Sequence, residues 1–298
     1  MSDHPDGAGD RNAGTPPPPR HLPFAGATLR LGLAPIAESE WLESGPDLAA
    51  QLAAKRALLA GRREAVLRHL PGSEPACSEA LAIVRDNLLR HHGKTLPEPA
   101  RDGGAHPLEL AAGFAAEDLC VLERGDGGYR LTAGCVCFPS NWSLAEKLGQ
   151  PVAAIHGPVP DFAPTLAAPV DRVFERLAAG HIVARFNWLV HDTPDLHQVG
   201  RKPGAEPIAP EEAGERLWLR VERQTLRRLP RSGAVLFTIR THLHRMRDAI
   251  TAPDSAAALA AALRSMPPSL AAYRHMGRIS PPLLVWLDRL AECQPGPA

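Results

Sequence analysis

One histidine of this 298-residue chain stands in an unusually rigid segment. His156 follows the apolar run VAAI and precedes Gly157-Pro158-Val159-Pro160, so that a residue permitting close backbone approach and two residues with a fixed φ angle adjoin it. A stiff loop with one imidazole can present a single axial ligand to haem iron, because the porphyrin supplies four further nitrogens. The alternative is a structural histidine that is hydrogen-bonded within a turn.

A second group of candidate residues lies in two β-rich runs, RLWLRVERQTLRRL (216–229) and AVLFTIRTHLH (234–244), which the turn signal PRSG joins into a hairpin. Side chains alternate between the two faces of a strand, so every second residue shares a face. We expect the apolar residues of both runs on one face and a polar row on the other: Arg220, Glu222, Gln224, Thr238, Arg240 and His242.

In such a row Glu222 could hold a cation or act as a base, while the arginines could hold anionic groups. The alternative is a solvent-facing sheet surface with ion pairs that each contribute about 0 to 1 kcal/mol. The run HIVARFNWLVHD (181–192) offers the same choice. Arg185 and Asn187 share one of its faces and belong either to the surface or to a pocket, whereas Trp188 is expected in the core.

The sequence gives little support for a metal centre built only from protein ligands. None of the 13 histidines stands at zincin or zinc-finger spacing. His242 and His244 share a strand face and could in principle chelate a metal, and Cys135-x-Cys137 is a lone C-x-C. The patterns G-x-S-x-G, G-x-G-x-x-G and the P-loop are absent, so hydrolases and nucleotide-binding proteins of those types are not supported.

The remaining sequence must supply the elements that position these side chains. A first hairpin is expected in 119–138, with its turn at 125–128, and brings the number of strands to about five. Helical periodicity and stop signals predict helices in 47–70, 78–92, 143–149, from about 164 to 179, 255–266, 268–276 and 280–292. This order predicts an α+β fold in which helices surround a mainly antiparallel sheet.

The charge balance, the cysteines and the distribution of apolar residues narrow the class of protein further. With 33 basic and 33 acidic side chains the net charge is zero, which gives no reason to expect nucleic acid or an anionic membrane as a partner. The five cysteines lie mostly in apolar runs, and no signal peptide or transmembrane run is visible, so we expect a cytoplasmic protein. Residues 1–22, with TPPPP, are expected to form a disordered tail, and residues 23–293 a single domain.

Four segments together carry a resemblance to a known family: WLES…LAAKRALL, FPSNWSLAEKLGQPVAAIHGPVP, ARFNWLV and LWLRVERQTLRRLPRSGAVLFTIRTHL. They are similar to the haem-dependent oxidative N-demethylases, the haem-bearing oxygenase subunit related to dimethylamine monooxygenase. The resemblance runs from about Leu29 to Trp286 and is densest around His156 and Glu222.

The resemblance implies a PAS-like sheet with haem b, and hence iron, in a pocket against it. It also implies that O2 oxidises the N-methyl group of a small secondary alkylamine such as dimethylamine, giving a primary amine and formaldehyde. Electrons would come from NADPH through a separate reductase subunit with a flavin and an iron–sulfur centre. A folate-dependent subunit could take up the formaldehyde.

On this resemblance His156 is the expected axial haem ligand, and Glu222 is the expected catalytic-site anchor for a dimethylammonium-like cation. His242 joins the catalytic site at a position where relatives more often have tyrosine, so a shifted substrate preference could follow. Three arginines are candidates for binding haem propionates or for pocket ion pairs: Arg185, Arg220 and Arg240. Two other possibilities stay open: a haem-binding PAS-like sensor or interaction protein without turnover, and a family member that has lost haem.

Overall fold

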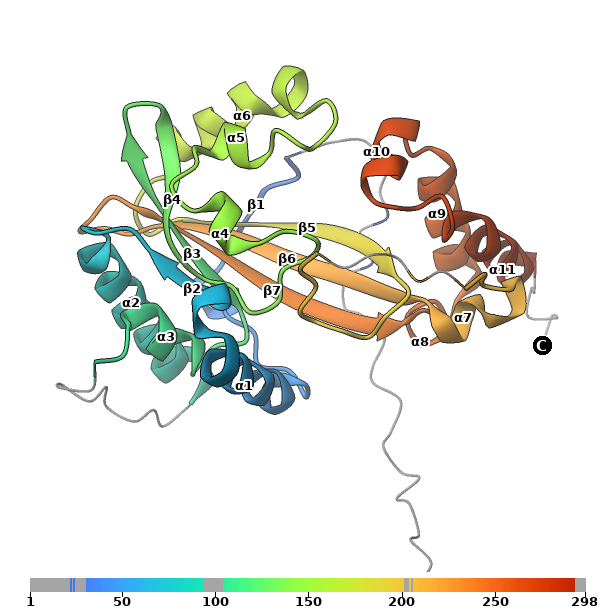
Figure 1. Cartoon of the computed structure of the whole chain (residues 1–298), viewed down its shortest axis with the longest axis horizontal. Helices are drawn as coiled ribbons and strands as arrows, with labels where there is room; N and C mark the ends of the chain where they lie inside the picture. The colour runs from blue at the N-terminus through green and yellow to red at the C-terminus, as the bar shows by residue number, and fades with distance from the viewer. Residues whose placement is uncertain are drawn as a thin grey trace, which may run out of the picture.

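A computed structural model describes residues 22, 24, 31–93, 104–200, 204 and 206–292 of the chain. Seven strands form one sheet in which every pair of neighbours is antiparallel (Figure 1). Across the sheet they are β1 (Ala34–Ile36), β5 (Ile182–His191), β6 (Trp218–Arg228), β7 (Val235–Arg245), β3 (Asp118–Gly125), β4 (Gly128–Cys135) and β2 (Leu67–His69). The long central strands β5, β6 and β7 therefore carry all the strand residues expected at the site.

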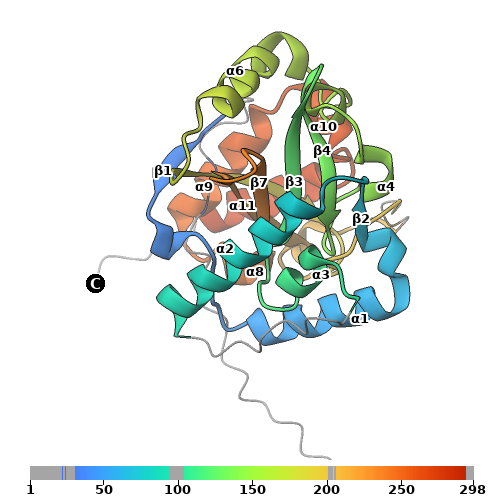
Figure 2. The ribbon, with the colours of Figure 1, turned by 90° about the vertical axis from the view of Figure 1, so that its left-hand side faces the viewer.

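Helices cover both faces of the sheet, as the two views show (Figures 1 and 2). Leu119 and Val121 of β3 face one hydrophobic cluster, and the alternate residues Cys120 and Leu122 face another. The first cluster is closed by α1 (Leu48–Val66), α2 (Glu74–His92) and α3 (Pro107–Ala112). The second is closed by α4 (Leu144–Lys147), α5 (Val152–Ile155) and α6 (Phe162–Arg176).

The far ends of β5, β6 and β7 are covered by a third cluster of helices, to the right in Figure 1. Its helices are α7 (Ala213–Arg216), α8 (Met246–Ala249), α9 (Pro253–Arg264), α10 (Pro268–Tyr273) and α11 (Ser280–Glu292). Two single 3-10 turns, η1 (Glu38–Glu40) and η2 (Pro210–Glu212), precede α1 and α7. Among the described residues, no helix combines the length and the apolar character needed to cross a bilayer.

The α+β class and the antiparallel sheet confirm the sequence prediction, whereas the PAS-like assignment stays a prediction. The sequence missed the three-residue strands β1 and β2 and the short helices α3, α5, α7 and α8, because such short elements leave no periodicity. Helix α2 also begins earlier than expected, at Glu74. Cys77, Cys120, Cys135 and Cys137 are buried free thiols, as expected, while Cys293 and nearly all of the predicted tail lie outside the described residues.

The hairpin of β6 and β7 forms as expected, but the predicted single polar row is wrong. The register pairs Glu222 with Thr241 and Arg223 with Arg240. Since directly opposed residues point to the same face, Arg240 and His242 lie on the face opposite to Glu222. Six residues separate the paired ends Arg228 and Val235, so each even-numbered residue of β6 lies opposite an odd-numbered residue of β7. The even-numbered residues of the two strands therefore point to opposite faces, because a change of register by one residue moves every side chain of a strand to the other face.

Candidate functional site

The polar side chains of the central strands form two sets on opposite faces of the sheet. Asn187 pairs with Glu222, and Glu222 with Thr241, so these three share one face, which we call the α6 face because α5 and α6 cover its other end. The other face, which α1 covers, is the α1 face; Arg240 and His242 lie on it. The predicted site residues therefore divide between the two faces.

His156 caps the C-terminus of α5 on the α6 side of the sheet. Its Nδ1 lies 2.9 Å from the backbone oxygen of Val152, and its ring stacks on Phe162 with centroids 4.5 Å apart and planes 10° from parallel. Because a carbonyl oxygen only accepts hydrogen bonds, Nδ1 carries the proton and Nε2 keeps its lone pair. The imidazole is thus fixed in the tautomer that can coordinate a metal through Nε2.

The surroundings of His156 also keep its ring neutral. Burial lowers its pKa below the ordinary value of 6.5; the hydrogen bond with Val152 opposes this shift, and the positive charges of Arg185 and Lys147 add to it. A neutral imidazole is the form that binds metal, and the lowered pKa of His156 favours that form.

Arg185, on β5, lies within electrostatic range of both His156 and Glu222. Its Nε is buried without a hydrogen-bond partner, and among the described residues no carboxylate lies at ion-pair distance from its guanidinium. Burial lowers the pKa of Arg185, which the negative charge of Glu222 opposes. An unpaired, partly buried guanidinium of this kind suits an anionic group such as a carboxylate.

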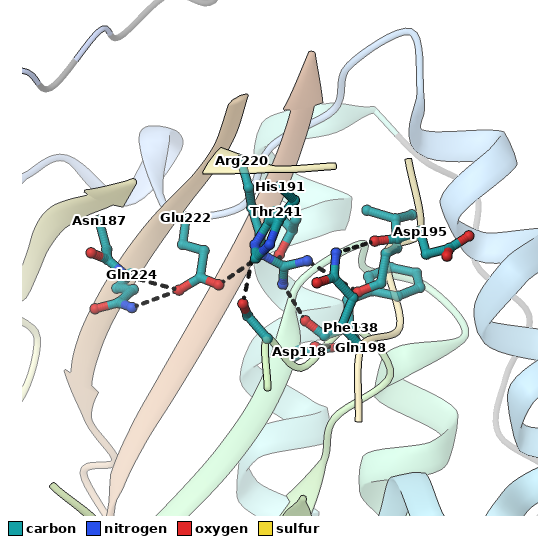
Figure 3. Close-up of polar contacts among 12 residues, drawn as sticks. Asp118, Phe138, Asn187, His191, Asp195, Gln198, Arg220, Glu222, Gln224 and Thr241 are labelled. Carbon is teal, nitrogen blue, oxygen red and sulfur yellow. Dashed lines mark hydrogen bonds and ion pairs between the residues drawn. The ribbon is translucent and has the colours of Figure 1, made fainter. Parts of the chain in front are cut away.

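The carboxylate of Glu222 is held from two sides, and its side chain is 10% exposed. Its Oε1 accepts a hydrogen bond from Arg220 Nε at 2.9 Å. Its Oε2 accepts bonds from Gln224 Nε2 at 3.1 Å and Asn187 Nδ2 at 3.4 Å (Figure 3). The network leaves the carboxylate with a defined orientation and with lone pairs beyond those that its neighbours use.

Arg220 fixes that orientation because its own guanidinium is tied to the backbone. It is fully buried and donates to the carbonyl oxygens of Leu196, at 3.0 Å, and Phe138, and to Thr241 Oγ1 at 3.2 Å (Figure 3). The resemblance implies that Arg220 either binds a haem propionate or forms an ion pair within the pocket. Its contacts correspond to the ion pair.

The Phe138 carbonyl that receives Arg220 belongs to a turn held by a buried carboxylate. Asp118 accepts hydrogen bonds from the backbone nitrogens of Cys137, at 2.9 Å, and Phe138, at 2.8 Å. Lys55 Nζ lies 3.4 Å from Asp118 Oδ1, and neither side chain is exposed by more than 1%. Two buried ion pairs therefore stabilise the position of Glu222: its own pair with Arg220, and the pair of Lys55 with Asp118 that holds the turn to which Arg220 bonds.

Sequence reasoning missed Arg274, which follows α10 directly. Its guanidinium donates to Asn187 Oδ1 at 3.2 Å and lies over the ring of Trp188, 5.6 Å from the centroid. Burial lowers the pKa of Arg274, while the negative charge of Glu222 opposes the shift. Nothing in the run YRHM distinguishes this arginine from one on a helix surface, so its position depends on how α10 packs.

Arg240 and His242 lie away from this cluster. Arg240 donates to Asp47 Oδ1 at 2.6 Å and to Gln51 Oε1, and His242 Nε2 lies 2.8 Å from Glu43 Oε2. The α1 face thus pairs both residues with acids or amides that precede or begin α1. They are not neighbours of Glu222, and we leave them out of the site.

A family model described as "Haem-dependent oxidative N-demethylase, alpha subunit-like" matches residues 90–284. The chain belongs to this family. The name indicates dependence on haem and an alpha subunit, and so suggests an assembly of more than one kind of chain. The matched range contains His156, Arg185 and Glu222.

The residues of the α6 face fit the cofactor that the haem-dependent oxidative N-demethylase family requires. His156 offers a free Nε2 on a neutral, oriented ring, and the unpaired Arg185 can take a propionate. Nowhere among the described residues is a group of three or more His, Cys, Asp or Glu side chains arranged to hold a metal ion. A single axial ligand is all that a porphyrin-bound iron needs from the protein.

Proposed function

We propose that the chain is the haem-bearing subunit of a monooxygenase that removes the N-methyl group of a small secondary alkylamine such as dimethylamine. The observation that carries the proposal is the His156 imidazole, whose Nδ1 is bound to Val152 so that Nε2 is free, in a chain of this family. His156 would hold the iron of haem b, and Arg185 a propionate. The bound haem would supply the activation of O2.

Glu222 would bind the substrate as an ammonium ion. A buried cation needs a counter-charge, and the carboxylate is kept in one orientation by Arg220, Asn187 and Gln224. One oxygen atom of O2 enters the N-methyl group and the other leaves as water, which consumes two electrons and two protons. The resulting carbinolamine breaks its C–N bond and gives a primary amine and formaldehyde.

The electrons would come from NADPH through a separate reductase subunit with a flavin and an iron–sulfur centre. In the described chain the cysteines are buried and free, and no cluster of them could bind iron and sulfur. A folate-dependent subunit would capture the formaldehyde. The alternative, a haem-binding sensor without turnover, differs at this point, because it needs neither reductant nor amine.

The test begins with the absorbance spectrum of the full chain supplied with hemin. We expect a Soret band that His156→Ala shifts or abolishes. The matched control is His197→Ala: His197 Nδ1 also binds a backbone oxygen, that of Cys137 at 2.8 Å, but His197 lines another hollow together with Arg62 and Arg68. Protein that stays colourless with added hemin would contradict haem binding.

A second step separates the enzyme from the sensor. With haem, O2, NADPH and a reductase present, formaldehyde should appear in proportion to the amine consumed. A haem protein that releases no formaldehyde from any N-methylamine would instead support the sensor.

A further inference from the structure

The α6 face has more cations than the proposed alkylamine reaction needs. Around the single carboxylate of Glu222 lie three guanidiniums, of which Arg220 is its ion-pair partner. Arg185 and Arg274 have no carboxylate at ion-pair distance among the described residues. A bare dimethylammonium ion would therefore enter a region that already carries excess positive charge, which raises the cost of binding it.

The two unpaired arginines belong to different parts of the site. The charge of Arg185 acts on His156, the expected haem ligand. Arg274 is affected by Glu222 more strongly than by Arg185, and it reaches Glu222 through one side chain, Asn187. Arg185 is thus placed to bind an anionic group of the haem. Arg274 is placed to bind an anionic group of the ligand that Glu222 binds.

Asn187 shows what kind of ligand would fit between Arg274 and Glu222. Its Oδ1 accepts from Arg274 at 3.2 Å, and its Nδ2 donates to Glu222 Oε2 at 3.4 Å. The oxygen and nitrogen of one carboxamide are about 2.3 Å apart. The carboxylate oxygen and the ammonium nitrogen of an α-amino acid are about 3 Å apart, since two carbon atoms separate them, and they have the same acceptor and donor roles.

We propose that the substrate class is the N-methylated α-amino acid, bound as a zwitterion with its ammonium group on Glu222 and its carboxylate on Arg274. N-methylglycine is the smallest example. Its negative end offsets the excess charge of the arginines, and the planar guanidinium can bind it with two parallel hydrogen bonds. The inference rests on the proposed function for the reaction, but the selectivity of binding can be measured without it.

The chemistry changes only in the product. N-methylglycine, O2, two electrons and two protons give glycine, formaldehyde and water. The reductant is the same NADPH-dependent reductase, and the bond that breaks is again that between the nitrogen and the oxidised methyl carbon.

The experiment is isothermal titration calorimetry of the full chain at pH 7, with and without haem. The probes are N-methylglycine, N-methylglycinamide, in which a neutral carboxamide replaces the carboxylate, and dimethylammonium chloride. Both comparison probes keep the ammonium group and lack the carboxylate, so we expect N-methylglycine to bind about tenfold or more tightly than either of them, as one charge-assisted pair provides. Arg274→Gln should remove this advantage, while Arg274→Lys should restore part of it.

The matched control is Arg264→Gln, on α9, whose guanidinium pairs at the surface with Asp288 and is 52% exposed. It should leave all three affinities unchanged. A hemin titration of each variant separates the alternatives: if Arg274→Gln weakens hemin binding and does not change amine selectivity, Arg274 binds a propionate and the proposal is wrong. Equal affinity of the wild type for N-methylglycine and its amide would also overturn it.

Failure of the proposed function gives a different result. A chain that selects N-methylglycine over its amide but releases no formaldehyde from it would keep the binding assignment and remove the reaction. A chain that demethylates dimethylamine and shows no preference for the carboxylate would keep the reaction and remove the assignment.

Discussion

The two faces of the central sheet carry similar residues in very different states of pairing. On the α1 face, every guanidinium of β6 and β7 has a carboxylate from the segment 38–47: Arg227 with Glu38 at 3.0 Å, Arg223 with Glu43 at 3.6 Å and Arg240 with Asp47 at 2.6 Å. On the α6 face, Arg185 and Arg274 have none among the described residues. Balanced charges are expected to hold the fold together, whereas unbalanced charges are expected to bind something else.

The largest expected effect is on the free energy of unfolding, for a substitution on the α1 face, where the charges are paired. Arg240→Met removes a fully buried guanidinium that bonds to Asp47 and Gln51, and should lower the free energy of unfolding by about 2 kcal/mol or more. Urea unfolding followed by circular dichroism measures this loss. The affinity of the remaining folded protein for hemin should not change.

Arg264→Met, which breaks only the exposed pair with Asp288, is the control and should cost less than about 1 kcal/mol. If Arg240→Met weakened hemin binding at unchanged stability, the division between the two faces would not hold.

Replacing an arginine by methionine on the α6 face should affect hemin binding and not the stability of the fold. Arg185→Met removes a partly buried cation without a carboxylate partner, so the haem-free chain should be as stable as the wild type or more stable by up to about 1 kcal/mol. Hemin affinity, measured by titration at the Soret band, should fall about tenfold through loss of a propionate contact. A large loss of stability with unchanged hemin affinity would reverse the assignment.

The smallest effect is expected for His242, and it depends on pH. Burial raises the pKa of Glu43, but the hydrogen bond and charge of His242, with the charges of Arg223 and Arg240, outweigh this and lower it below its ordinary 4.5. A lowered carboxyl pKa contributes stability above 4.5 that is lost as the pH falls through the lowered value. His242→Gln should therefore cost about 0.5 to 1 kcal/mol at pH 6 and nothing once Glu43 is protonated.

Urea unfolding of the wild type and His242→Gln from pH 6 to 3 measures this convergence. Formaldehyde release should stay the same in the variant, because His242 lies on the α1 face. A large loss of turnover would return His242 to the catalytic site.

The sequence allowed the fold class and part of the site to be predicted, because both depend on local pattern. Alternation along β6 put Arg220, Glu222 and Gln224 on one face, where they are. The rigid segment after α5 drew attention to His156 before any contact was known. What could not be predicted depends on long-range geometry: the register that separates Arg240 from Glu222, and the packing of α10 that brings Arg274 to Asn187.

The hydrogen bonds from Arg220 to two backbone carbonyls have a consequence for how the chain folds. Its guanidinium bonds to Phe138, which is 82 residues away, and to Leu196, which is 24 away, while the turn at Phe138 depends on Asp118 and, through it, on Lys55 of α1. Contacts of high sequence separation require the closure of long loops, whose entropy cost slows folding. A chain in which these loops have not closed would hold Glu222 without a fixed orientation, so the amine binding proposed for Glu222 depends on the complete native fold.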